Sequence, residues 1–504
     1  MPRIIFGGYV FIAIMCFVAG NSAAAAPQCA PTPQDCASLA LAAMGGRERI
    51  EAVKSLRLEG AQHTLLVEQS YRQEPFITAY ARTKEELDFA SQRRLLQTHL
   101  TWPESDPGQA DSDSTVVTGP EGAINRAGKS DTPASRANLE AARYALALGP
   151  TRLLLTASSA ADLHFETPQL LRQTLHPVLA FKWQRRDVRV LINPFNHLPD
   201  AVESVGVFYD HWYQWGDVRQ RIYFDNWQTF HGIRYPTNEV EERNGMLWES
   251  RQVLRLDLNP NLDAADFKLD AQAAQKGLQS KGWESPFKAQ KGVTLAPGIT
   301  LFPGSWNATL VRQDDGVVLL ESPLSGTYIG GVIDKAKAEN PGRSVKAVLS
   351  TSDSWPHVGG VRQVVALGLP VYILDLNKPL LDRLIQAPRH LNPDLLAQSP
   401  RTAQWRIVSK KLQVGSGANR MELYPLRGPC TERQYMVYFP EHHLLYASDT
   451  LALNEDGSLY DPELMREVLE AVKREGIEVS TVFAMHQGPL PWAQVTALVE
   501  KALT

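Results

Sequence analysis

Apolar and polar residues alternate with a period of two over several stretches in the first half of the chain. The alternation begins in residues 55–102 and is clearest in residues 188–256, where Asn-Pro, Gly-Asp and Asn-Gly pairs separate the runs. This period is typical of strands that bury one face, and turn residues between short runs favour an antiparallel meander. We therefore predict an antiparallel β domain in this half.

Helical spacing of apolar residues occurs beside these strands. Residues 38–53 predict a short helix that a Gly45-Gly46 pair interrupts, and residues 138–158 predict two helices separated at Gly149-Pro150. Residues 105–135 are rich in Asp, Ser, Gly and Pro, which is typical of an exposed loop or insertion.

Five tryptophans lie in or near the predicted strands: Trp183, Trp212, Trp215, Trp227 and Trp248. Aromatic residues on a sheet are mainly core residues, so we expect them to pack inside the domain. A concave surface that holds a lipid or a peptide is the functional alternative.

The double-glycine helix, the antiparallel strands and the stretch from Phe224-Asp225-Asn226-Trp227 to Gly232-Ile233-Arg234-Tyr235-Pro236 resemble periplasmic lipoprotein-carrier-like domains. The resemblance covers residues 36–270. It implies a curved antiparallel sheet closed by helices around an apolar cavity, with a lipid-like or other small-molecule ligand. The Gln- and Lys-rich residues 271–292 are interpreted as a linker.

The pattern changes after residue 292. Two strands joined by an Asp315-Gly316 turn precede a helix at residues 327–339 and a buried strand at residues 345–349. A loop then leads through Gly359-Gly360 to a second helix, which ends at Gly368 and precedes another strand.

This β-β-α-β-loop-α-β order resembles the first half of a metallo-β-lactamase fold, in which that loop carries the motif H-x-H-x-D-H-x-G-G. Aligned on the two glycines, Ser352 and Ser354 replace the first two histidines, Pro356 replaces the aspartate, and His357 remains. The resemblance covers residues 298–504, within a domain expected at residues 293–504.

Three further positions match the family's motif. Asp449 occupies the place of the bridging aspartate, His486 that of the terminal histidine, and Cys430 replaces a histidine. The fold class expected from both resemblances is α+β: an N-terminal curved antiparallel β-sheet domain followed by an αββα metallo-β-lactamase-like sandwich.

These departures decide the metal chemistry that the resemblance implies. The first ion of the family's two-ion site would have Ser352, Ser354 and Cys430, and hydroxyls are poor ligands beside imidazole, so this ion is expected to be lost. His357, Asp449 and His486 suffice for a single catalytic zinc ion with an open position.

Two alternatives remain at this point. The two histidines are hydrogen-bonded remnants of a metal-free core, or Cys430 is a nucleophile with His357 or His486 as its base. Zero or one zinc ion is therefore expected. No P-loop or dinucleotide fingerprint is present, so no nucleotide cofactor is expected.

The first residues indicate the compartment. Arg3 precedes an apolar run at residues 4–19 and an Ala-rich exit, which predicts a signal peptide at residues 1–25 cleaved after Ala24 or Ala25. A membrane anchor is the alternative, but the run is short for a span. We expect a periplasmic or secreted protein with no membrane span in the mature chain.

Composition and cysteines refine this interpretation. The 504 residues have a net charge of −4, which is too close to balance to suggest nucleic acid or an anionic membrane as a partner. Cys29 and Cys36 either form a disulfide in an oxidising compartment or stay as two thiols. Nothing in the sequence sets an oligomeric state.

The function expected from the sequence is that of an exported, hydrolase-like protein of the metallo-β-lactamase fold with at most one metal ion. Its substrate is an unassigned ester, amide or thioester. The alternatives are a non-catalytic binding protein and an apolar-ligand carrier that uses the N-terminal β domain.

Overall fold

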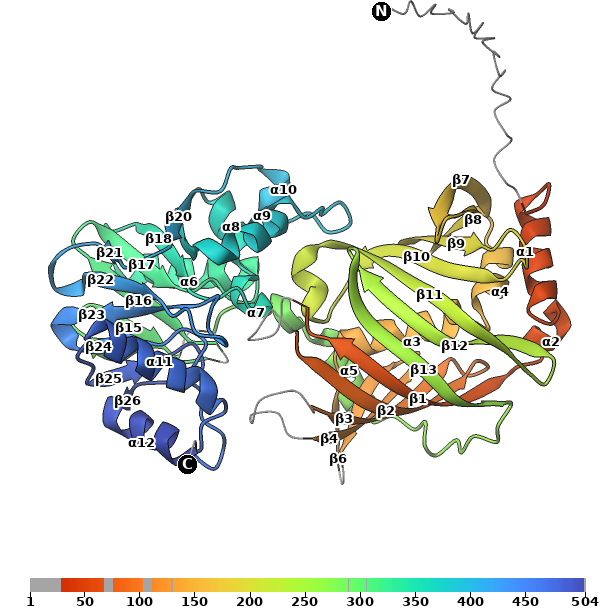
Figure 1. The fold of residues 1–504 in the computed structure, drawn as a ribbon, viewed down its shortest axis with the longest axis horizontal. Coiled ribbons are helices and arrows are strands. Elements are labelled where there is room, and N and C mark those ends of the chain that lie inside the picture. The colour runs from red at the N-terminus through yellow and green to blue at the C-terminus, as the bar shows by residue number, and fades with distance from the viewer. Residues whose placement is uncertain are drawn as a thin grey trace, which may run out of the picture.

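The structure, a computed structural model, describes residues 29–67, 76–102, 111–127, 130–288, 290–304 and 306–502 (Figure 1). The expected signal peptide, residues 1–25, lies outside the described residues. Among the helices of the described ranges, none is both long and apolar enough to cross a membrane.

A 13-stranded antiparallel sheet dominates the first half, so the predicted large antiparallel sheet is confirmed. Its strands are β1 (Ser55–Leu65), β2 (Thr78–Asp88), β3 (Arg93–Thr101), β4 (Ser112–Gly119), β5 (Gly122–Ala127), β6 (Ser130–Pro133), β7 (His164–Leu171), β8 (Thr174–Trp183), β9 (Arg186–Ile192), β10 (Pro199–Val207), β11 (Asp217–Phe230), β12 (Ile233–Arg243) and β13 (Met246–Leu258). The order β6-β5-β4-β3-β2-β1-β13-β12-β11-β10-β9-β8-β7 joins two meanders through the pairing of β1 with β13.

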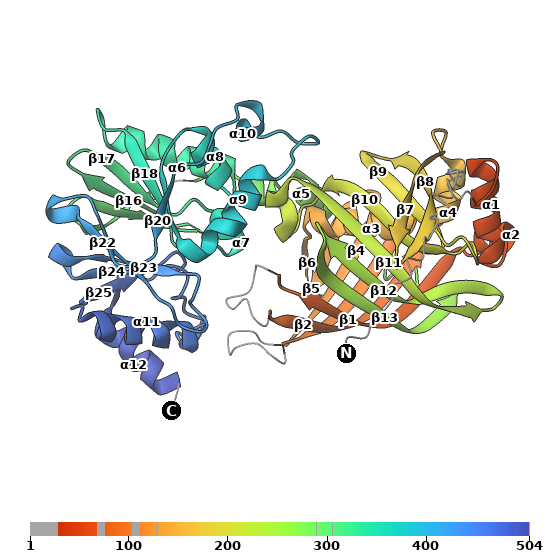
Figure 2. The ribbon, with the colours of Figure 1, turned by 45° about the horizontal axis from the view of Figure 1, so that its top comes forward.

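Helices accompany this curved sheet: α1 (Pro33–Ala43), α2 (Arg47–Glu51), α3 (Arg136–Leu148), α4 (Leu153–Ser159) and α5 (Ala271–Gln279). Figure 2 shows α3 within the curve of the sheet and α1, α2 and α4 gathered at one end. The breaks predicted at Gly45-Gly46 and Gly149-Pro150 separate α1 from α2 and α3 from α4.

The expected loop at residues 105–135 is wrong where the structure describes it, because β4, β5 and β6 lie there. Val117 and Ile124 are fully buried on these strands and pack with Ala274 of α5. The stretch expected as a linker, residues 271–292, carries α5, and its Trp283 stacks on Tyr213.

Two mixed sheets form the second half. The strands of the first are β14 (Val293–Ala296), β15 (Ile299–Phe302), β16 (Ala308–Gln313), β17 (Gly316–Leu320), β18 (Val345–Ser350), β19 (Val371–Leu374) and β20 (Trp405–Val408). Those of the second are β21 (Leu412–Val414), β22 (Met421–Pro425), β23 (Tyr435–Phe439), β24 (Leu444–Tyr446), β25 (Thr481–Phe483) and β26 (Leu490–Pro491).

Helices cover the outer faces of these sheets: α6 (Gly326–Glu339), α7 (Trp355–Val358), α8 (Val361–Ala366), α9 (Lys378–Gln386), α10 (Leu395–Gln398), α11 (Pro462–Glu475) and α12 (Trp492–Ala502). One apolar cluster packs the two sheets face to face, with Val318 and Val437 among its members. A second, with Met436 and Val468, packs α11 and α12 on the other side. The second half therefore has four layers in space: helices, the first sheet, the second sheet, and helices again.

The two halves share one hydrophobic core. Trp212 and Trp215, on the 3₁₀ helix η1 (His211–Trp215), belong to the same buried cluster as Trp355 of α7 and Ile329 of α6. The ring centroids of Trp212 and Trp355 are 4.8 Å apart in an edge-to-face arrangement. These tryptophans are thus core residues, as expected.

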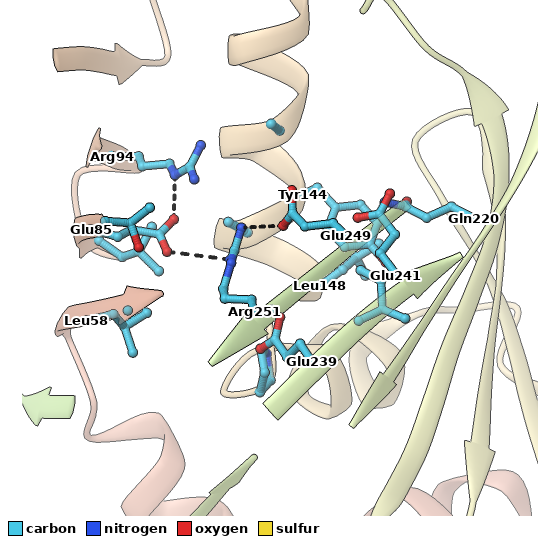
Figure 3. Close-up of a pocket in the computed structure, with 18 of the residues that line it drawn as sticks. Leu58, Glu85, Arg94, Tyr144, Leu148, Gln220, Glu239, Glu241, Glu249 and Arg251 are labelled. Carbon is cyan, nitrogen blue, oxygen red and sulfur yellow. Dashed lines mark hydrogen bonds and ion pairs between the residues drawn. The ribbon is translucent and has the colours of Figure 1, made fainter. Parts of the chain in front are cut away.

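A cavity of about 220 Å³ lies between α3 and the inner face of the sheet (Figure 3). The resemblance to lipoprotein carriers implied an apolar cavity, but Glu85, Glu239, Glu249 and Arg251 line this one beside apolar residues. Because unpaired charges are costly to bury against hydrocarbon, this lining does not favour an apolar-ligand carrier.

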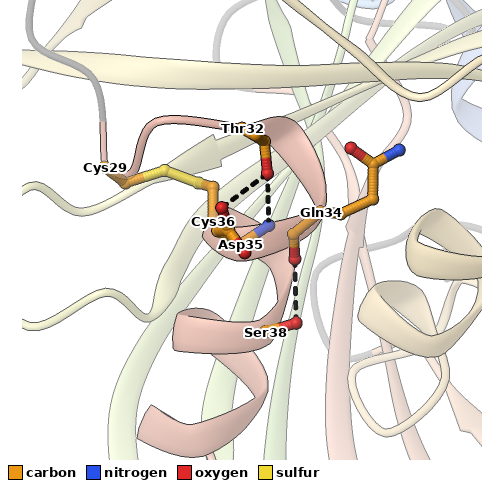
Figure 4. Close-up of a disulfide and its surroundings, with 6 residues drawn as sticks. All are labelled: Cys29, Thr32, Gln34, Asp35, Cys36 and Ser38. Carbon is orange, nitrogen blue, oxygen red and sulfur yellow. Dashed lines mark hydrogen bonds between the residues drawn. A yellow bond between two sulfur atoms is a disulfide. The ribbon is translucent and has the colours of Figure 1, made fainter.

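A disulfide joins Cys29 and Cys36 at the start of the described chain (Figure 4). Thr32 caps α1, because its side-chain oxygen accepts a hydrogen bond from the Asp35 backbone N–H at 3.1 Å. The disulfide therefore ties the first described residues to a capped helix.

Candidate metal centre

The candidate ligands follow the ends of different strands. Strand β17 runs parallel to β18, and β24 runs parallel to β25. His357 lies beyond the end of β18, Asp449 beyond that of β24 and His486 beyond that of β25. Strand β18 belongs to the first sheet, and β24 and β25 belong to the second. Because the two sheets pack face to face, residues that follow the carboxyl ends of these strands converge at a shared edge.

The structure brings the three predicted residues together. Asp449 Oδ2 lies 2.9 Å from His357 Nε2, and Asp449 Oδ1 lies 3.3 Å from His486 Nε2. One ligand atom from each residue lies within 4.8 Å of the others. Trp306 packs edge-on against both imidazoles, with centroid distances of 4.7 Å to His357 and 4.5 Å to His486.

Charge stabilises the ionised form of Asp449. Burial acts to raise the pKa of this carboxyl, but the charge and hydrogen bonds of His357 and His486 outweigh it and hold the pKa well below its usual range. Asp449 is therefore a carboxylate at neutral pH, available as a ligand or as an acceptor for two imidazole N–H groups.

A second buried carboxyl group, Glu321, lies beneath the site. It accepts hydrogen bonds from the Thr351 hydroxyl and, at 3.1 Å, from the Tyr446 hydroxyl. Burial raises the pKa of Glu321 to about 7, and His357 and these hydrogen bonds oppose the rise. Since the Thr351 hydroxyl also lies 2.6 Å from that of Ser448, this network fixes the loops that carry His357 and Asp449.

A cleft of about 420 Å³ opens beside Asp449 and His486. Ser352 and Ser354, which stand where the resembled family has histidines, both line it. Asp353 lines it too and forms an ion pair with Arg433. The cleft thus adjoins the ligand set and gives a substrate access to it.

Cys430 is not part of this arrangement. It is absent from the lining of the cleft and from the His/Asp/His cluster of the described residues. Its backbone N–H donates to Glu467, and burial together with that carboxylate raises the pKa of its thiol to about 12. A protonated thiol away from the imidazoles does not fit the nucleophile alternative.

The N-terminal half supports the loop that carries His357. The Tyr213 hydroxyl donates to the Leu324 carbonyl, and the Leu324 N–H donates to the Pro356 carbonyl at 2.6 Å. Position 359 next to these groups must be glycine, because a Cβ atom there would collide with the Leu324 carbonyl oxygen and the Tyr213 hydroxyl. Close packing therefore explains why the first of the two motif glycines, Gly359, has no side chain.

Sequence reasoning missed Trp306, Glu321 and Arg433. Trp306 lies between β15 and β16 and Glu321 directly follows β17, so neither belongs to a periodic pattern or a motif. A buried-strand run that ends in a lone charged residue, as at Leu320-Glu321, is the one signal that could have marked Glu321.

Comparisons with solved structures find metallo-β-lactamases and an alkylsulfatase. The chain is similar over 42% of its length to the inverting sec-alkylsulfatase Pisa1 from a Pseudomonas species, with 15% identity, a TM-score of 0.31 and only 40% of that chain covered. It is similar over 43% of its length to the metallo-β-lactamase DIM-1, with 14% identity, a TM-score of 0.34 and 99% of that chain covered. It is also similar over 42% of its length to a metallo-β-lactamase from Pontibacter korlensis, with 15% identity, a TM-score of 0.32 and 98% of that chain covered.

No family model matches the chain, and no curated protein matches it. At these identities and TM-scores, the similarities to solved structures add no argument to the geometry of the chain's own residues.

Proposed function

We propose that residues 293–504 form a metallo-β-lactamase-like hydrolase domain whose reduced site holds one metal ion, zinc, at His357, Asp449 and His486. The observation that carries this proposal is the convergence of three ligand atoms within 4.8 Å from three separate strand ends, beside an open cleft. Ester, amide or thioester bonds are the proposed substrates.

The donor set fits zinc. Two donors on one tetrahedral zinc ion lie about 3.3 Å apart at metal–ligand distances of about 2.0–2.1 Å. The separations of 2.9 and 3.3 Å between Asp449 and the two imidazoles are close to this value. His357 Nδ1 is buried without a hydrogen bond among the described residues, and Glu321 is the buried carboxyl group that interacts with this imidazole.

The chain's own residues prepare the site for hydrolysis. A bound zinc ion would supply Lewis acidity toward the oxygen of a scissile carbonyl. The two oxygens of Asp449 contact Nε2 of His357 and Nε2 of His486, and these atoms would serve as the ligands of the ion. Trp306 packs against both imidazoles and holds the rings in place. The ion pair of Asp353 with Arg433 fixes the position of both side chains in the cleft wall.

Elemental analysis of protein purified without chelator tests the site. We expect no more than one zinc ion per chain, and His357→Ala or His486→Ala should abolish binding. Hydrolysis of generic β-lactams and phosphodiesters should stay near background, because only one ion is held.

Two variants serve as matched controls. Ser352→Ala removes a cleft hydroxyl and His442→Ala removes a histidine that contacts Asn419 away from the cluster, and both should retain the zinc. Two tightly bound ions per chain would refute the reduced site. A wild-type protein that takes up no zinc when it is supplied would favour the metal-free alternative.

We also propose that the protein is periplasmic or secreted after loss of residues 1–25. The Cys29–Cys36 disulfide supports this, because such bonds persist in oxidising compartments.

A further inference from the structure

The cavity of the N-terminal half combines an apolar wall with buried charges. Leu58, Leu148 and Val253 line one part of it. Glutamates from β2, β12 and β13 line another, together with Arg94 and Arg251 (Figure 3). At about 220 Å³ it lies below the range of about 300 to 1,000 Å³ that is usual for ligand pockets, which favours a small ligand.

Three of the four arginines that line the cavity already have carboxylate partners, and the fourth, Arg186, has the Ser204 hydroxyl at 3.5 Å. Arg94 Nε lies 2.5 Å from Glu85, and Arg251 lies 3.3 Å from Glu249 and 3.9 Å from Glu85. Arg243 pairs with Glu241 at 2.5 Å and with Asp210 at 2.6 Å. An anionic ligand would therefore have to displace an ion pair at each of these three arginines, and Arg186, whose guanidinium lies over the rings of Phe208 and Tyr144, is the one arginine of the lining without such a pair among the described residues.

Glu239 is left without such a partner. It faces Arg251 across β12 and β13, yet it makes no ion pair or hydrogen bond with any of the described residues, although it lines the cavity. Beside it, Glu241 and Glu249 occupy directly opposite positions on these strands, an arrangement of like charges that is unfavourable in a sheet. The cavity thus has an excess of negative charge.

Tyr235 is a second, independent sign of a missing ligand. Its side chain lines the cavity and the residue is only 3% exposed, but its hydroxyl has no hydrogen bond with any described residue. It precedes Glu239 by four positions on β12, so both side chains point to the same face of the sheet. Buried polar groups normally find partners, and Tyr235 has none here, beside the partly buried and unpaired Glu239.

We propose that this cavity binds a small organic cation, a primary amine with a short apolar body. Its ammonium group donates hydrogen bonds to the Glu239 carboxylate and the Tyr235 oxygen, and its hydrocarbon part lies against Leu58, Leu148 and Val253. This ligand satisfies the unpaired acceptor and offsets the excess negative charge, which neither a lipid chain nor an organic anion would do.

The protonation of Glu239 agrees with this geometry. Burial raises the pKa of Glu239 to about 7; Arg251 opposes the rise, whereas Glu85, Glu249 and Glu241 add to it. Tyr235 lies on the same strand and Tyr144 on α3. The other charged or titratable groups that line the cavity are Glu59, Arg94, Glu140, Arg186, Tyr209, Asp210 and Arg243. An ammonium ion would favour the carboxylate form, so ligand binding near pH 7 should release a proton.

Titration calorimetry on the full mature chain tests the proposal with hexylamine, and with hexanol and hexanoate as neutral and anionic probes of similar size. We expect saturable binding of one hexylamine per chain, at least tenfold tighter than either other probe. Glu239→Gln should weaken hexylamine binding at least tenfold, because a charge-assisted hydrogen bond is lost.

Glu242→Gln is the matched control. Glu242 is the neighbour of Glu241 on β12, accepts a hydrogen bond from Tyr223 and is absent from the cavity lining, so this variant should bind hexylamine like the wild type. Repeating the titration at pH 7 in buffers of different ionisation enthalpy should reveal proton release in the wild type and none in Glu239→Gln. Equal affinity for hexylamine and hexanol, unchanged affinity in a folded Glu239→Gln variant, or no saturable hexylamine binding would overturn the proposal.

Discussion

Replacing Trp212 by alanine tests whether the N-terminal half supports the candidate metal centre. Trp212 is 0% exposed, and its ring contacts Trp248 at 5.7 Å and Trp355 at 4.8 Å. A buried aromatic side chain removes about 150 to 250 Å² from water, which at about 25 cal/mol per Å² corresponds to about 4 to 6 kcal/mol. Tryptophan-to-alanine changes in cores usually cost about 3 to 5 kcal/mol, so we expect a loss near 4 kcal/mol.

The same change should weaken zinc binding, because Trp355 begins the helix that carries His357. Urea unfolding followed by fluorescence measures the free energy, and competition with a chromophoric chelator measures zinc affinity. Trp227→Ala is the control: Trp227 packs on Phe224 in a cluster made of N-terminal residues. It should lower stability and leave zinc affinity unchanged. A Trp212→Ala variant that loses less than about 1 kcal/mol, or that binds zinc as the wild type does, would refute a shared core that positions the site.

Further outcomes follow from particular residues. The folded-state pKa of Glu239 is raised from 4.5 to about 7, so its contribution to stability is fully present below pH 4.5 and is lost as the pH rises through 7. The loss amounts to at most about 3 kcal/mol. Unfolding measured from pH 4 to 9 should show this loss in the wild type and not in Glu239→Gln. Gly359→Ala should destabilise the protein by about 1 to 3 kcal/mol, whereas Gly330→Ala, which meets open space in α6, should not; thermal unfolding of both variants decides. Reduction of the Cys29–Cys36 bond should cost about 2 to 3 kcal/mol, and thiol titration of the mature, denatured, unreduced chain should find only Cys430. N-terminal sequencing of the exported protein should start between Ala25 and Pro27, and a mature chain that begins at Met1 would contradict cleavage.

Much of the fold could be predicted because local signals agreed with tertiary packing. Val188 and Val190 alternate with polar neighbours and are buried on β9, and the Asp315-Gly316 turn joins β16 to β17 as expected. The strands after residue 111 could not be predicted in this way. Val117 and Ile124 are too few to form a pattern, and what buries them is α5, which lies about 150 residues further along the chain.

The candidate ligands could be predicted from a motif, but the charged cavity could not. In β12, Glu239 and Glu241 alternate with Val240, and a period of two does not say which face of a strand is inside. Polar residues on such a strand are taken as solvent-facing by default. Here the sheet curves over α3, so those residues point into a cavity. Curvature depends on pairings between distant strands, which a single stretch of sequence does not encode.

Because the candidate ligands His357, Asp449 and His486 all follow strand ends, the apolar contacts that pack the layers of the second half are made by other residues. Selection can therefore act on chemistry and on folding separately in this chain. Ser352 and Ser354, in the cleft wall, can likewise be exchanged without touching the apolar contacts between the sheets. The chemistry of the cleft can thus change while the protein keeps its fold.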